Sequence, residues 1–248
     1  VGLKKSSVSS AFVKASRGAL DELNSRDLKP HRFTSIMVDG VGFGDRTVIA
    51  ALGITMTGEK LLLGLREGET ESWEIARDLF ESLIARGLKS DEPILFIIDG
   101  GKALKKAIQK VFAQMPIQRC VRHKERNILR YLPEDRHIEF RRRWKKLHGM
   151  NDFASAKREY DDLVFWLGHI NHAALQSLEE AGLETLTVIK LNVPPQLRKT
   201  LLSTNPIESM FSIQKPKVSR VKNWRSGPNQ VLRWAATSLL AAEKRFRK

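Results

Sequence analysis

The sequence is poor in cysteine: Cys120 stands alone among 248 residues, so an intrachain disulfide is excluded. Such usage is typical of a reducing compartment, and we expect a cytoplasmic protein. No apolar run approaches the roughly 20 residues that cross a bilayer, and no signal peptide is evident after Val1. These absences argue against a disulfide-stabilised secreted domain and against a membrane-spanning protein.

Acidic residues are scarce relative to basic ones, which gives a formal net charge of +15 and a pI of about 10.1. The imbalance is concentrated in one half of the chain. Residues 121–248 contain 25 Lys and Arg against 13 Asp and Glu, whereas residues 1–120 contain 18 against 15. A strong basic excess is typical of proteins that bind a polyanion. We therefore expect the second half to bind nucleic acid, although charge alone does not separate this from non-specific adhesion.

The order of strand and helix signals predicts an α/β fold. Continuous and alternating apolar runs predict strands, and apolar residues with a period of 3.6 predict helices. In chain order these are strands 33–38, 47–54 and 60–65, helix 69–86, strand 94–98, helix 102–112, strand 117–120 and helix 121–132. A meander followed by strand–helix repeats is the pattern of an RNase H-like core, which is a mixed sheet flanked by helices.

We expect four segments along the chain. Residues 1–30 form an N-terminal helix and a linker. Residues 31–132 form the first part of the RNase H-like core. Strand signals vanish over residues 133–200, where amphipathic periodicity predicts an all-α insertion. Residues 201–248 form C-terminal helices that complete the core and carry Glu208.

Three acidic residues stand at positions that suit metal ligands. Asp39 and Asp99 each follow an apolar run, where a strand is expected to end, and a carboxylate at a strand end has a rigid support. Glu208 follows Asn205 by three positions, the spacing of a helix capping box with Asn205 as the N-cap. Structural alternatives stay open: Asp99 caps the next helix or forms a turn with Gly100, and Glu208 only completes the capping box.

The sequence around these acids resembles one known family. The matching runs are Ile36-Met37-Val38-Asp39-Gly40, Phe96-Ile97-Ile98-Asp99-Gly100, Thr204-Asn205-Pro206-Ile207-Glu208 and the stretch from Gln118 to Leu129. Together they resemble the mutator-type transposases, the IS256-like family of bacterial insertion sequences, over about residues 33–248. Cys120 and His123 match the Cys-x-x-His signature of that family. Its members carry a DNA-binding region before the core, whereas about thirty residues precede the core here.

The resemblance implies a DDE transposase in which Asp39, Asp99 and Glu208 are the catalytic and metal-binding acids. Two Mg²⁺ or Mn²⁺ ions suit such hard oxygen ligands. Water attacks the phosphate at an element end, and the freed 3′-OH then attacks target DNA. The implied partners are double-stranded DNA and a second copy of the chain, in a cytoplasmic, nucleoid-associated setting. The acids alone would equally serve an RNase H-like nuclease without strand transfer, and an inactive, basic DNA-binding remnant is the third hypothesis.

Basic side chains around the expected site are candidate contacts to the DNA backbone, because such contacts give affinity without reading sequence. The candidates are Lys102, Lys105, Arg122, His123, Lys124, Arg126, Arg142 and Arg143, with Arg141, Lys145 and Lys146 beside them. Cys120, His123 and Asn205 are expected to be structural. A zinc site that also used His169 and His172 is disfavoured, because zinc needs four converging ligands. A packed thiol beside a hydrogen-bonded imidazole is the favoured interpretation.

Overall fold

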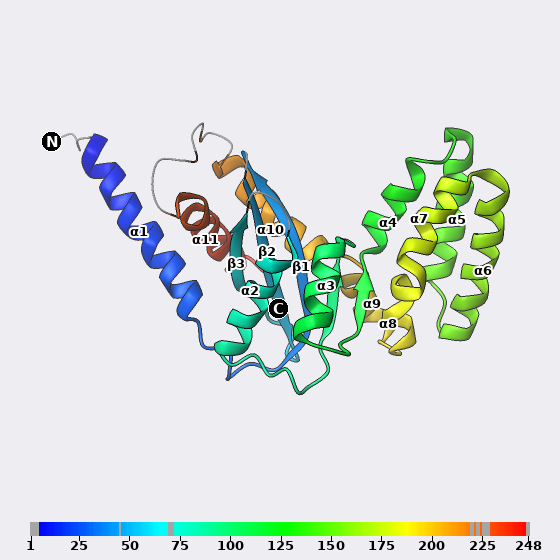
Figure 1. Cartoon of the computed structure of the whole chain (residues 1–248), viewed down its shortest axis with the longest axis horizontal. Helices are drawn as coiled ribbons and strands as arrows, with labels where there is room; N and C mark the ends of the chain where they lie inside the picture. Colours follow the sequence, from blue (N-terminus) through cyan, green and yellow to red (C-terminus); the bar gives the residue numbers. More distant parts are fainter. Residues whose placement is uncertain are drawn as a thin grey trace. The chain divides into compact units, whose positions relative to one another are not determined.

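The computed structural model describes residues 5–44, 46–68, 72–218, 221, 224 and 229–246 (Figure 1). The chain divides into two compact units that are interleaved in sequence. The first unit comprises Val1–Ile94, Gly101–Met115 and Pro206–Lys248, and the second comprises Leu95–Gly100 and Pro116–Asn205. Among the described residues, no helix is both long and apolar enough to span a membrane.

The first unit contains an antiparallel meander of strands β1 (Phe33–Phe43), β2 (Arg46–Thr55) and β3 (Lys60–Gly68). These strands form where the apolar and β-branched runs predicted them. β2 lies between the other two and is buried along most of its length. Gly44 (φ +63°) follows β1 and Gly58 (φ +82°) precedes β3, so both turns use backbone conformations that favour glycine.

One boundary in this meander differs from the prediction. The sequence predicts a strand that ends just before Asp39, but β1 continues to Phe43, so Asp39 lies inside the strand and opposite Ala50 of β2. Gly40 and Gly42, which indicate a turn in the sequence, are both paired with residues of β2. Pairing with a buried neighbouring strand overrides the low strand propensity of glycine.

The helices of the first unit pack on this meander and on one another. They are α1 (Lys5–Ser25), α2 (Trp73–Ala85), α3 (Lys102–Val111), α10 (Asn205–Val218) and α11 (Gln230–Glu243). α11 packs against β3 and β2, α1 packs along α11, and α2 packs against β3 and α3. Arg26, which follows α1, forms a bidentate ion pair with Glu243 of α11 at 2.8 and 3.0 Å. The predicted start of α2 at residue 69 lies outside the described residues, and the helix begins at Trp73 after the N-cap Ser72.

The second unit combines two short parallel strands with a set of helices. The strands are β4 (Leu95–Ile98) and β5 (Ile117–Arg119). The helical elements are α4 (Val121–Leu129), η1 (Glu134–Arg136), α5 (His137–His148), α6 (Phe153–Ile170), α7 (His172–Ala181), η2 (Gly182–Leu186), α8 (Thr187–Lys190) and α9 (Pro195–Leu201). Residues 133–200 are all described and contain no strand, which agrees with the helical character predicted for them.

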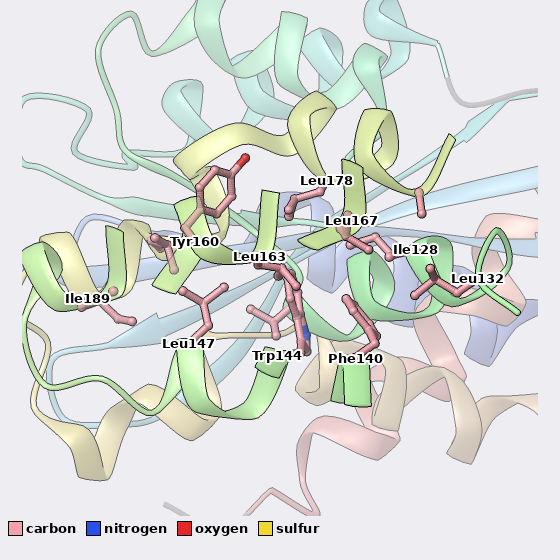
Figure 2. Close-up of a cluster of buried hydrophobic side chains, with 14 residues drawn as sticks. Ile128, Leu132, Phe140, Trp144, Leu147, Tyr160, Leu163, Leu167, Leu178 and Ile189 are labelled. Atoms are coloured by element: carbon pink, nitrogen blue, oxygen red, sulfur yellow. The ribbon is translucent and has the colours of Figure 1, made fainter. Parts of the chain in front are cut away.

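A hydrophobic cluster holds these helices together (Figure 2). Phe140, Trp144 and Leu147 from α5 meet Leu163 from α6 and Leu178 from α7, and all five side chains are almost completely buried. Phe140 and Trp144 stack with ring centroids 5.6 Å apart. Trp144 is therefore a residue of the hydrophobic core.

Within the described residues, the five strands form one mixed sheet in the order β3-β2-β1-β4-β5. β1 is the central strand, three strands are joined as an antiparallel meander, and β4 and β5 run parallel. The predicted α/β class, with a mixed sheet flanked by helices, is confirmed.

Candidate active site and nucleic-acid interface

Asp39 occupies a buried position in the central strand, where its exposed fraction is 8%. The backbone N–H of Gly40 donates a hydrogen bond to Asp39 Oδ1 at 2.9 Å. Val38 and Met37 before it are fully buried, so the strand backbone is held on both sides of the sheet. A carboxylate fixed in this way keeps its position without a flexible loop, which suits a metal ligand.

Asp99 follows β4, whose four residues are all buried, and its own side chain is half-buried. The next residue, Gly100, has φ +115°, a conformation that L side chains rarely adopt. A Cβ at Gly100 would lie 2.0 Å from Nη2 of Arg119. The turn after Asp99 therefore requires glycine at position 100 for two reasons. Its backbone angle is unfavourable for other residues, and the Arg119 guanidinium fills the space that a side chain would need.

Glu208 lies in the first turn of α10 and is half-buried. Ile207 and Met210 beside it are completely buried, so the helix is anchored on either side of the carboxylate. Asn205, predicted as the N-cap, is instead the first residue of α10, so the helix begins one residue earlier than predicted. The backbone N–H of Asn205 donates a hydrogen bond to Ser203 Oγ at 3.4 Å.

The three acids come from three different elements. Asp39 and Glu208 belong to the first unit, and Asp99 belongs to the second. Asp39 lies within β1, Asp99 directly follows β4 and Glu208 lies within α10. Each offers the hard oxygen atoms that Mg²⁺ and Mn²⁺ prefer.

Cys120 and His123 form a packed polar pair with Thr204. The backbone N–H and the hydroxyl of Thr204 both lie 3.4 Å from Cys120 Sγ, and the same hydroxyl lies 3.4 Å from His123 Nδ1. Burial raises the pKa of the Cys120 thiol, but hydrogen bonds from His123 and Thr204 outweigh it and leave the pKa below its ordinary value. The arrangement matches the predicted packed thiol and imidazole. His169 and His172 belong to no group of three or more metal-ligating side chains in the part of the chain that the structure describes.

Sequence reasoning missed an ionic network in which two buried cations share Glu180 of α7, a carboxylate that is itself 40% exposed. Arg119 donates to both carboxylate oxygens of Glu180 at 3.0 and 2.8 Å, and Lys124 Nζ donates at 2.7 Å. The side chains of Arg119 and Lys124 are 4% and 3% exposed. Burial raises the pKa of Glu180, but the bonds from Arg119 and Lys124 more than offset it and hold the pKa below its usual value. The network fixes the guanidinium that packs against Gly100, and thus supports the turn after β4.

The position of Lys124 changes one prediction. Lys124 was grouped with the candidate DNA contacts, but its ammonium group also donates to the carbonyl of Ser177 at 2.8 Å and burial lowers its pKa. A buried lysine that is already bonded to Glu180 is not available to a phosphate, so Lys124 has a structural role instead.

Next to Arg119 in the sequence, the buried Gln118 forms hydrogen bonds through both the nitrogen and the oxygen of its amide group. Its Nε2 donates to the carbonyls of Arg119 and Thr185 at 2.7 and 2.8 Å, and its Oε1 accepts from the N–H of Val188 at 2.9 Å. A buried amide with all its bonds made joins β5 to η2 and α8.

The other candidate DNA contacts differ in exposure. Lys102, Arg122, Arg126 and Arg142 are exposed, whereas Lys105, His123 and Arg143 are half-buried. Arg143 forms an ion pair with Glu139 at 2.8 Å and lies over the Trp166 ring, 5.0 Å from its centre. Arg143 is therefore already engaged within the protein, and Arg122 forms an ion pair with Glu125 at 3.2 Å although its side chain is exposed.

Comparison with known proteins shows which family the chain resembles. A family model described as Transposase, Mutator family, matches residues 1–241. The chain is 29% identical over 177 residues to the transposase for insertion sequence element IS1201 of Lactobacillus helveticus, which covers 71% of this chain and 47% of that protein. It is 28% identical over 194 residues to the transposase for IS6120 of Mycolicibacterium smegmatis, covering 76% of this chain and 59% of that protein.

A third relative is the transposase for insertion sequence element IS256 in transposon Tn4001 of Staphylococcus aureus. It is 34% identical over 114 residues, which is 46% of this chain and 29% of that protein. The chain spans about half the length of the curated relatives that it matches. Because the family model covers nearly all of the chain, the chain belongs to the Mutator family of transposases.

Proposed function

We propose that this chain is the catalytic part of an insertion-sequence transposase, which cleaves DNA at element ends and joins the freed 3′-OH to target DNA. The observation that carries the proposal is the set of three carboxylates on ordered elements in a member of the Mutator family. Asp39 lies in the central strand β1, Asp99 follows β4 directly, and Glu208 lies in the first turn of α10. An RNase H-like fold for the sheet and its helices is part of the same proposal.

The residue chemistry suits divalent metal ions, which the family implies. The proposed ligands Asp39, Asp99 and Glu208 offer carboxylate oxygens alone, the donor set of Mg²⁺ and Mn²⁺ sites. When bound, two such ions supply an activated nucleophile and a stabilised leaving oxygen. Asp39, Asp99 and Glu208 would hold these ions.

The chain's own contribution is to restrain the backbone that carries two of these carboxylates. Asp39 is restrained by the sheet and by the N–H of Gly40, and Asp99 is restrained by a turn that only glycine permits. Three carboxylates at one site would repel one another in the absence of cations, so rigid elements must hold them in place. Exposed basic residues, among them Arg122, Arg126 and Arg142, orient DNA through its phosphates.

Two copies of the chain are expected on DNA, because transposition requires two element ends to be brought together. Double-stranded DNA is then both the substrate at the element ends and the target.

A strand-transfer assay tests this proposal. The substrate is a duplex with the terminal sequence of the encoding element and a pre-formed 3′-OH, mixed with plasmid and Mg²⁺ or Mn²⁺. The proposal predicts joined products, and Asp39→Asn, Asp99→Asn and Glu208→Gln should each reduce joining by on the order of a thousandfold or more. Cleavage without joining would favour the nuclease, and DNA binding without either reaction would favour the inactive remnant.

A further inference from the structure

A basic groove runs between three helices of the second unit. It has a volume of about 660 Å³ and is lined by residues of α4, α5 and α9 and by the segment that leads to Asn205. We name it the α4–α5–α9 groove. Five cationic side chains line it, Arg122, Arg141, Lys145, Arg198 and Lys199, against one carboxylate, Glu125. The charge of its walls is therefore strongly positive.

Most of this positive charge is not neutralised by the protein. Glu125 is shared between Arg122 at 3.2 Å and Arg141 at 3.8 Å, so one carboxylate faces two guanidinium groups. Lys145 and Lys199 are exposed and form no ion pair within the described residues. Charges left unpaired at the rim of a groove attract anions from solution.

The remaining cation of the groove has a structural role. Arg198 is 7% exposed and donates to the backbone carbonyls of Val193, Met150 and Asn151 at 2.7 to 3.0 Å. It ties α9 to the loop between α5 and α6, and so holds Lys199 in a fixed position relative to Lys145. The wall behind them is rigid, because Trp144 lines the groove and is part of the hydrophobic cluster.

We propose that the α4–α5–α9 groove binds the phosphate backbone of duplex DNA. This inference rests on the proposed function and assigns a DNA-binding surface to that function. The cations come from three helices and do not converge on one point, which suits a series of phosphates rather than a single small anion. A smaller pocket of about 360 Å³ shares Arg122, Arg141 and Asn205 with the groove and adds Arg126, so the basic surface continues along α4.

Asn205 lies where the groove and the smaller pocket meet, because it lines both of them. It is also the first residue of α10.

The test measures binding of the full chain to a short random-sequence duplex, in EDTA so that no cleavage occurs, over a range of KCl concentrations. The groove variant combines Arg141→Gln, Lys145→Gln and Lys199→Gln. The matched control removes three exposed charges elsewhere in the same unit, with Arg136→Gln, Arg158→Gln and Lys190→Gln. Circular dichroism and the thermal midpoint establish that both variants fold.

The groove variant should bind at least about tenfold more weakly at low salt, and the slope of log K against log salt should fall by about 2 to 3. The control should change affinity by no more than about twofold, because scattered surface charges are screened. Equal losses in the two variants, or a loss confined to single-stranded DNA, would overturn the inference. If binding depends on the groove but the chain does not cleave DNA in Mn²⁺, the inference about the groove stands and the proposed function is contradicted instead.

Discussion

The two units of this protein use charge in different ways. In the first unit, Asp39 is a single buried acid in the central strand of a sheet, and Arg26 and Glu243 pair with each other. In the second unit, cations outnumber acids along the α4–α5–α9 groove, and Lys145 and Lys199 point to solvent. The difference is consistent with the proposed function, in which rigid strands would position the acids and a helical surface would bind DNA.

The units also differ in what stabilises them. Cross-strand pairing and the packing of α1, α2 and α11 stabilise the first unit. A hydrophobic cluster of its own and the ionic network around Glu180 stabilise the second. Substitutions in one network should therefore affect one unit far more than the other.

The largest stability effect is expected for Glu180→Ala. This substitution removes the carboxylate that the buried Arg119 and Lys124 share, and leaves only Glu184, 3.8 Å from Arg119. Since Glu180 is itself 40% exposed, we expect a loss of about 3 kcal/mol in the free energy of unfolding of the second unit, the low end for a broken buried ion pair. Hydrogen exchange should rise in α6 and α7 and stay unchanged in β2 and β3. The matched control is Asp161→Ala, which breaks the exposed Lys157–Asp161 pair and should cost less than about 1 kcal/mol. Equal effects of the two substitutions would contradict a structural role for the network.

A second prediction concerns pH and His148 in the second unit. Burial lowers the pKa of His148 to about 4 from 6.5, partly offset by its hydrogen bond to the carbonyl of Trp144. Because the pKa of His148 is lower in the folded state than in the unfolded state, the unfolded state takes up a proton first as the pH falls. The folded state therefore has its full stability above about pH 6.5 and loses part of it as the pH falls toward 4. The loss is roughly 3 kcal/mol by pH 4. Urea unfolding followed by tryptophan fluorescence should show this dependence in the native chain and lack it in His148→Gln.

The smallest effect is expected at the start of α2 in the first unit. Ser72 is the N-cap, and its Oγ accepts a hydrogen bond from the N–H of Ile75 at 3.3 Å. Ser72→Ala should lower the free energy of unfolding by about 1 kcal/mol. Ser72→Asp, which keeps an acceptor at the cap, should restore most of it. A larger loss in the second unit than in the first would break the comparison between the units.

Much of the fold could be predicted from the sequence, because apolar periodicity reports local structure. The meander, the helix after residue 101 and the helical character of residues 133–200 all follow from it. The extension of β1 past Asp39 could not be predicted, since it depends on pairing with β2 rather than on the glycines themselves. α9 was hidden because Pro194 and Pro195 indicate a break, although proline at the first helical turn is favourable.

The candidate site was less accessible to sequence reasoning. The acids and the basic character of the second half are visible as residue types at recognisable positions. The structural role of Lys124 is not visible in the sequence, because its partner Glu180 lies 56 residues away. The contribution of Lys199 depends on Arg198, which ties α9 to backbone carbonyls almost fifty residues earlier. Such long-range contacts decide which cations are buried and which face solvent.

The central claim is that Asp39, Asp99 and Glu208 share one site for divalent cations. Calorimetric titration of the full chain with Mn²⁺ tests it most directly, with Glu125→Gln, which alters an acid of the groove, as the matched control. We predict Mn²⁺ binding that survives in Glu125→Gln and is abolished or strongly weakened by each of Asp39→Asn, Asp99→Asn and Glu208→Gln. Binding that persists unchanged in any one of these three variants, or is absent from the native chain, would contradict the claim.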